Sequence, residues 1–198
     1  MRLGRQRPAS EASADYVFLI MGLIHPCKGH EEAIRALAVL HHEGRRSVRL
    51  SIVGAGNARY THELKQLCKE LGVEGHVEFK GYVPDPFTAL QDADALLMCS
   101  RHEAMGRVTV EAMAARRPVI GYRSGATPEL IENGKTGLLY SEGYEELARC
   151  MARMADNRIW AAELGANGWK RARDEFVIEV YAERIHSVLT DVLTTRET

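Results

Sequence analysis

The sequence has almost no surplus of charge of either sign, because 26 Lys and Arg residues stand against 27 Asp and Glu residues in 198 positions. Proteins that bind nucleic acid mainly by neutralising phosphates carry a basic arm or face, and the sequence has no evident one. We therefore expect no nucleic-acid partner. The hydrophobic content of 45% is near the globular average, which excludes disorder, collagen-like repeats and coiled coils.

Paired cysteines and long apolar runs are also missing. The chain has four cysteines without a CxxC pair, at Cys27, Cys68, Cys99 and Cys150. This spacing predicts neither a zinc site nor a disulfide framework, and reduced thiols in a cytoplasmic protein are expected. The longest apolar run, residues 16–24, is too short to span a bilayer, and it lacks the uncharged flank and the cleavage site of a signal peptide.

Strand-like and helix-like segments alternate after a polar start at residues 1–14, which we predict to be a flexible N-terminal segment. Strands are predicted at residues 16–21, 48–53, 77–80, 95–99, 118–122 and 137–140. Helices are predicted at residues 31–42, 60–71, 86–92, 108–115, 127–131, 144–155, 159–175 and 176–194. Because parallel strands need helical crossovers, we predict an α/β fold with one domain at residues 15–198. It is a Rossmann-like, doubly wound parallel sheet of about six strands with helices on both faces, plus C-terminal helices.

Ligands of such sheets bind beyond the carboxyl ends of the strands, where the connecting loops gather. The loop after the first strand carries Lys28 just before a helix, where a lysine can reach a phosphate, although a solvated charge is the simpler interpretation. The loop after the second strand begins Gly54-Ala-Gly56, but Arg59 replaces the last glycine of a dinucleotide fingerprint. We interpret Gly54-Ala-Gly56 as a turn that lets the backbone approach either a ligand or a neighbouring loop.

The most informative stretch is residues 100–114, directly after the central strand. Glu103 is predicted in the loop and Glu111 in the next helix, with Gly106 at the turn between them. The backbone amides of residues 105–108 would point at the end of the strand and would suit a diphosphate. Carboxylates accept hydrogen bonds, so Glu111 suits the two hydroxyls of a ribose and Glu103 those of a sugar, unless both are ordinary surface carboxylates.

Other chemistries fit this stretch less well. His102-Glu103 does not continue to the HExxH pattern of zinc peptidases, and the eight histidines show no ligand spacing, so no metal site is predicted. A glycosidase pair needs both carboxylates to flank one bond, whereas Glu111 is predicted inside a helix well below the tip of the loop.

Taken together, these residues resemble the signature of retaining group 1 glycosyltransferases, also called family four, which have GT-B architecture. The resemblance covers about residues 16–193. It rests on Glu103-x7-Glu111, Ala112-Met-Ala114, Pro118-Val-Ile120, Gly125, Glu129-Leu-Ile131, Gly134-Lys-Thr-Gly137, Gly22, Pro26-Cys-Lys-Gly29, Val53-Gly-Ala-Gly56 and residues 77–84. It implies a hexosyltransferase that moves a sugar from a nucleotide-diphosphate donor, of UDP or GDP type, to an acceptor with retained configuration and without a metal or other cofactor.

The resemblance also implies roles for single residues. Glu103 would be the catalytic residue that contacts the donor sugar, and Glu111 would bind the ribose. The other donor-binding residues would be Lys28 for the diphosphate, Gly54 for the cleft, the backbone of Tyr82 and Val83 for the base, and Ala104, Met105, Gly106, Arg107 and Val108 for the sugar and phosphates.

Two positions depart from the family's pattern. Leu23 stands where the family usually has an arginine that binds phosphate. Losing a charge-assisted contact of about 1.5–3 kcal/mol weakens donor binding by about one or two orders of magnitude, unless Arg107 or Arg59 substitutes. Arg117 stands where a glycine is usual before Pro118, and we expect it to change a turn.

The N-terminal, acceptor-binding domain of GT-B enzymes has no counterpart in this sequence. We therefore expect the domain at residues 15–198 to be the C-terminal, nucleotide-sugar-binding half of a longer enzyme, or a separate subunit, and to be inactive alone. The acceptor would be a glycan, a lipid or a small molecule, and the other domain would make any contact with the inner face of the membrane. Apolar positions of the last helix, residues 176–194, are expected to be exposed and to cause weak self-association.

Two alternatives to a transferase stay open. The first is a non-catalytic or regulatory module that binds nucleotide sugars, which Leu23 favours. The second is a sugar-nucleotide epimerase of the same architecture, which the spacing of Glu103 and Glu111 and the segment 134–137 fit less well.

Overall fold

The computed structural model describes residues 15–195, so the predicted flexible segment at residues 1–14 lies outside the described residues. Its centre is a six-stranded parallel sheet with the order β3-β2-β1-β4-β5-β6. The strands are β1 (Tyr16–Met21), β2 (Val48–Val53), β3 (Val77–Gly81), β4 (Ala95–Met98), β5 (Val119–Tyr122) and β6 (Gly137–Tyr140).

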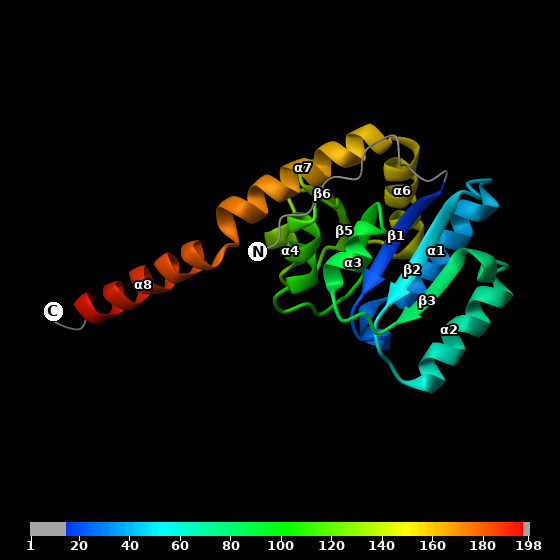
Figure 1. Cartoon of the computed structure of the whole chain (residues 1–198), viewed down its shortest axis with the longest axis horizontal. Helices are drawn as coiled ribbons and strands as arrows, with labels where there is room; N and C mark the ends of the chain where they lie inside the picture. Colours follow the sequence, from blue (N-terminus) through cyan, green and yellow to red (C-terminus); the bar gives the residue numbers. More distant parts are fainter. Residues whose placement is uncertain (1–14, 196–198) are drawn as a thin grey trace.

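Helices connect and follow the strands (Figure 1). The α-helices are α1 (His30–His42), α2 (Ala58–Glu70), α3 (Pro86–Gln91), α4 (Arg107–Ala114), α5 (Thr127–Leu130), α6 (Gly143–Asp156), α7 (Arg158–Glu175) and α8 (Ile178–Thr195). Two short 3-10 helices are η2 (Pro26–Lys28) and η3 (Glu74–His76). The α/β fold class predicted from the sequence is confirmed, and each predicted element ends within two residues of the observed one.

Both faces of the sheet are covered, which explains why β1, β4, β5 and β6 are almost continuously apolar. The edge strand β3 differs, because its Glu78 and Lys80 are exposed and alternate with half-buried residues. Phe18 and Ile20 of β1 belong to a core under α1, α2 and α6, whereas Leu19 belongs to a second core under α3 and α4. Helix α7 contributes to both, because Leu164 lies in the first core and Ala172 in the second.

The order of the strands reverses between β1 and β4. From β1 the chain builds outward to β2 and β3, then returns to the other side of β1 and builds outward again. At such a point the loops after the two central strands leave toward opposite faces of the sheet, so a crevice forms between them. The fold therefore places a ligand site beyond the ends of β1 and β4.

The loops after β1 and β2 pack backbone against backbone. The Ile24 amide donates to the Ala55 carbonyl at 2.8 Å. A Cβ atom on Gly54 would lie 1.7 Å from the Gly22 carbonyl oxygen, and Gly54 has a φ of +151°. Gly54-Ala-Gly56 thus lets its backbone approach a neighbouring loop, which is one of the two interpretations that the sequence left open.

The turn after α4 corrects one prediction. The sequence places the altered turn at Arg117, but Arg116 is the residue that takes a left-handed conformation, with a φ of 61°. A helix commonly ends on one left-handed residue, and this position follows the C-cap Ala115. The Arg116 guanidinium stacks over the Trp169 ring, 4.1 Å from its centre, while Arg117 donates to the Gln91 carbonyl at 3.3 Å.

Helix α8 extends away from the sheet (Figure 1). Its exposed apolar side chains are Ile178, Tyr181, Ile185, Val188, Leu189, Val192 and Leu193. The expected exposure of apolar positions on the last helix is therefore found. Within residues 15–195, no helix combines the length and the apolar character needed to cross a membrane.

Candidate functional site

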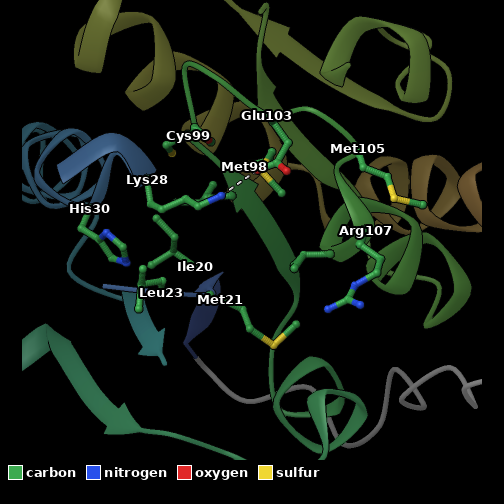
Figure 2. Close-up of a pocket in the computed structure, with 14 residues that line it drawn as sticks. Ile20, Met21, Leu23, Lys28, His30, Met98, Cys99, Glu103, Met105 and Arg107 are labelled. Carbon is green, nitrogen blue, oxygen red and sulfur yellow. Dashed lines mark hydrogen bonds and ion pairs between the residues drawn. The ribbon is translucent and has the colours of Figure 1, made fainter. Parts of the chain in front are cut away.

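A cavity of about 430 Å³ lies at the ends of β1 and β4, where the strand order reverses (Figure 2). Its lining comes from the end of β1, the start of α1, the end of β4, and the loop that leads into α4. The lining residues are Ile20, Met21, Gly22, Leu23, Lys28, His30, Leu97, Met98, Cys99, Ser100, Glu103, Met105, Arg107 and Val108.

An ion pair spans the cavity between the loops after β1 and β4. The Lys28 Nζ lies 2.8 Å from the Glu103 Oε2, and the two side chains are 33% and 17% exposed (Figure 2). Burial raises the pKa of Glu103, but the hydrogen bonds from Lys28 and from the Gly106 amide outweigh it and hold the pKa below its ordinary value. Glu103 is therefore a carboxylate at neutral pH.

Two backbone segments fix Glu103 in place. Its Oε1 accepts a hydrogen bond from the Gly106 amide at 3.2 Å, and its carbonyl accepts one from the Ala126 amide at 2.8 Å. A Cβ atom on Gly125 would lie 2.4 Å from that carbonyl oxygen, so this contact requires glycine. The Gly125 of the family signature thus packs against the backbone of the candidate catalytic residue.

The first turn of α4 borders the cavity. Its first amides, those of Arg107 and Val108, have no acceptor inside the helix and can bind an anion. The Arg107 side chain is 81% exposed, and its Nε lies 3.9 Å from the Glu111 Oε1. Burial raises the pKa of Glu111, and the charge of Arg107 opposes that shift.

The structure brings five of the predicted site residues into the cavity wall: Lys28, Glu103, Met105, Arg107 and Val108. The others lie around it at the same edge of the sheet. Gly106 and Glu111 belong to the start and the second turn of α4, and Ala104 is exposed in the loop before it.

The remaining predicted residues follow β2 and β3. Gly54 follows β2, and Tyr82 and Val83 follow β3, two strands away from β1. Arg59, one of the two candidate substitutes for the missing arginine, lies in α2 with an 89% exposed side chain and pairs with Glu63 at 3.0 Å. Arg107 is the candidate that lines the cavity.

Sequence reasoning missed several lining residues, among them Met21, Met98, Ser100 and His30. Met21 and Met98 are the last residues of β1 and β4, and only the strand order, which hydrophobic periodicity does not encode, makes these two strands neighbours. His30 is fully buried, and this burial lowers its pKa to about 4, so the ring is neutral at pH 7. Within residues 15–195, no cluster of three His, Cys, Asp or Glu side chains could hold a metal ion.

The sequence matches the model of a known protein family. A family model described as "Glycosyl transferases group 1" matches residues 5–171. The chain belongs to this family. The resemblance seen in the sequence is therefore confirmed.

The chain is also similar to parts of longer curated proteins. It is 33% identical over 145 residues to the lipopolysaccharide core biosynthesis glycosyltransferase LpsE of Rhizobium meliloti, covering 72% of this chain and 41% of that protein. It is 34% identical over 139 residues to the N-acetyl-alpha-D-glucosaminyl L-malate synthase of Bacillus anthracis, covering 70% and 35%. Across the curated relatives, the chain spans between 28% and 43% of their length.

Solved structures show the same fold. The Anabaena protein Alr3699/HepE in complex with UDP has a TM-score of 0.83 and 28% identity, covering 90% of this chain and 49% of that one. The same protein has also been solved with UDP-glucose. The C-terminal domain of a group 1 family protein, LpcC of Francisella tularensis, covers 82% of this chain and 87% of that domain, with a TM-score of 0.75. At 24% identity, that likeness shows the fold alone.

Proposed function

We propose that this domain binds the nucleotide-diphosphate sugar donor of a retaining hexosyltransferase in the cavity between β1 and β4. One observation carries the proposal. Lys28 and the first residues of α4, whose amides have no acceptor inside the helix, line the same cavity at the point where the strand order reverses. The likeness to a protein solved with UDP and with UDP-glucose supports a donor of the UDP type, and a GDP sugar remains an alternative.

Lys28 and the amides of Arg107 and Val108 would hold the diphosphate. When the bond between the sugar and the diphosphate breaks, negative charge grows on the leaving group, and fixed donors then stabilise it more than in the ground state. These groups supply the positive charge, so the proposal includes no metal and no further cofactor. Glu103 would contact the sugar and Glu111 the ribose.

The base would lie at the end of β3, against the backbone of Tyr82 and Val83. Neighbouring strands are about 4.8 Å apart, so two strand spacings separate β3 from β1 by roughly 10 Å. Such a span suits an extended nucleoside diphosphate. Gly54 follows β2, the strand between β1 and β3, and would lie between the base and the diphosphate. Ala104, Met105 and Gly106 would lie beside the transferred sugar.

Nucleotide titrations test this proposal. UDP, GDP and ADP are added to the purified protein in a calorimeter, and one of them is expected to bind. Glu111→Ala is expected to weaken that binding by about tenfold, the equivalent of one hydrogen bond to a charged group. Glu163→Ala, which removes an exposed carboxylate from α7, is the control and should bind like the unaltered protein. Equal affinity of the Glu111 variant would show that the ribose lies elsewhere.

A second domain would complete the enzyme. Because the chain spans less than half of the length of its curated relatives, we propose that another domain binds the acceptor, a glycan, lipid or small molecule, and that this domain alone does not turn over. The four cysteines are unpaired, which supports a cytoplasmic setting with any membrane contact left to the other domain.

A binding module without turnover is the alternative that one observation favours. Leu23, at the family's arginine position, lines the cavity with a 59% exposed side chain. Sugar transfer to any acceptor by a longer polypeptide that contains this domain would exclude the alternative.

The exposed apolar side chains of α8 are expected to cause weak self-association. The weight-average sedimentation coefficient should then rise with protein concentration. The double variant Ile185→Lys and Leu189→Lys places two charges on that surface and should remain monomeric. A concentration series that shows only monomer for the unaltered protein would refute the expectation.

A further inference from the structure

The main cation of the cavity is already neutralised within the protein. Lys28 lies 2.8 Å from the Glu103 carboxylate, in a wall where both side chains are at least two-thirds buried. A diphosphate that enters the cavity must therefore compete with Glu103 for the same ammonium group. Arg107, the other cation in the wall, is mostly exposed and faces the Glu111 carboxylate.

The two partners of this pair differ in how firmly they are held. The second oxygen of Glu103 accepts from the Gly106 amide, and its backbone is fixed by the Ala126 amide. Lys28 instead ends a short 3-10 helix and carries its charge on a flexible four-carbon stem. We therefore expect Lys28 to move when the pair opens, while Glu103 stays in place.

We propose that Glu103 acts as an internal competitor for Lys28 and thereby sets the preference of the cavity for a nucleotide sugar over the free nucleoside diphosphate. This inference rests on the proposed function. With a nucleotide sugar, the sugar hydroxyls donate to Glu103 and replace the lost ion pair. With the nucleoside diphosphate alone, nothing replaces it, so Glu103 takes Lys28 back and the product is released more readily.

Glu103→Gln is the decisive variant. Glutamine has the same size and can still accept from the Gly106 amide, but it has no charge to hold Lys28. We expect pyrophosphate and UDP to bind this variant about tenfold more tightly than the unaltered protein in calorimetry. The advantage of UDP-glucose over UDP should shrink by at least the same factor. Equal or weaker binding of pyrophosphate, or no detectable binding to either protein, overturns the proposal.

Two further variants show whether the gain passes through Lys28. Lys28→Met alone and together with Glu103→Gln should bind pyrophosphate equally, and a gain that persists without Lys28 overturns the proposal. Glu31→Gln is the charge-matched control, because Glu31 is exposed, pairs with Arg35 at 2.8 Å, and lies on α1 three residues after Lys28. A gain in this control as large as in Glu103→Gln would show a long-range field and overturn the proposal.

Thermal unfolding establishes that each variant is folded. If Glu103→Gln does not fold, Glu103→Asp replaces it. The aspartate carboxylate is shorter by one methylene, so it also releases Lys28. This variant should raise the affinity for pyrophosphate by a smaller factor. If no nucleoside diphosphate binds any variant while pyrophosphate still shows the gain, the proposed function fails and the competition by Glu103 stands.

Discussion

Replacing Leu23 by arginine is expected to raise the affinity for UDP or GDP by about ten- to a hundredfold. Leu23 lines the cavity with a largely exposed side chain, directly after Gly22, the first residue beyond β1. A guanidinium at this position adds a charge-assisted, bidentate contact to a diphosphate that otherwise depends on Lys28 and backbone amides. A contact of about 1.5–3 kcal/mol corresponds to that range of affinities.

Calorimetry of Leu23→Arg and Leu23→Gln separates charge from size. The glutamine variant is polar and of similar length but uncharged, and we expect it to bind like the unaltered protein. The gain of the arginine variant should shrink at high salt, because the added contact lies at a partly exposed position. If the arginine and glutamine variants bind equally, the diphosphate does not lie beside residue 23.

Gly54→Ala is expected to lower the free energy of unfolding by about 3 kcal/mol or more, or to prevent folding. A Cβ atom at this position would lie 1.7 Å from the Gly22 carbonyl oxygen and 2.7 Å from its carbon. Both are backbone atoms, so no side chain can rotate away. The first loop would have to leave the second, and it would carry Leu23 away from the cavity.

Urea unfolding measures this cost. Gly72→Ala is a control for strain at a positive φ without a steric clash, because Gly72 has a φ of +68° but no atom within 4 Å of its would-be Cβ. This control reports the strain of a left-handed alanine alone, about 1–2 kcal/mol. A loss of stability in Gly54→Ala no larger than in Gly72→Ala would mean that the two loops can separate without cost.

The fold was predictable because its signals are local. Strands buried on both faces are continuously apolar, and short connections leave room for only one crossover helix each. The site was only partly predictable, because its central contact joins Lys28 and Glu103 across 75 residues. Only the strand order makes β1 and β4 neighbours, and hydrophobic periodicity does not encode that order. For the same reason, Met21 and Met98 could not be recognised as cavity residues.

The shift of the turn from Arg117 to Arg116 has a different cause. Helix α4 ends on a residue in the left-handed conformation, which is usually glycine. Because Arg116 occupies this position, the sequence has no glycine to show where the helix ends. Arg116 stacks on Trp169 because α7 packs against α4, and the sequence alone does not predict that packing.

Helix α7 has a consequence for how the domain unfolds. Because one end of the helix completes the core on one face of the sheet and the other end completes the core on the opposite face, its loss exposes apolar surface on both sides at once. The two layers are thereby tied into one cooperative unit. Helix α8 lies beyond this unit, so it can fray without loosening the walls of the cavity.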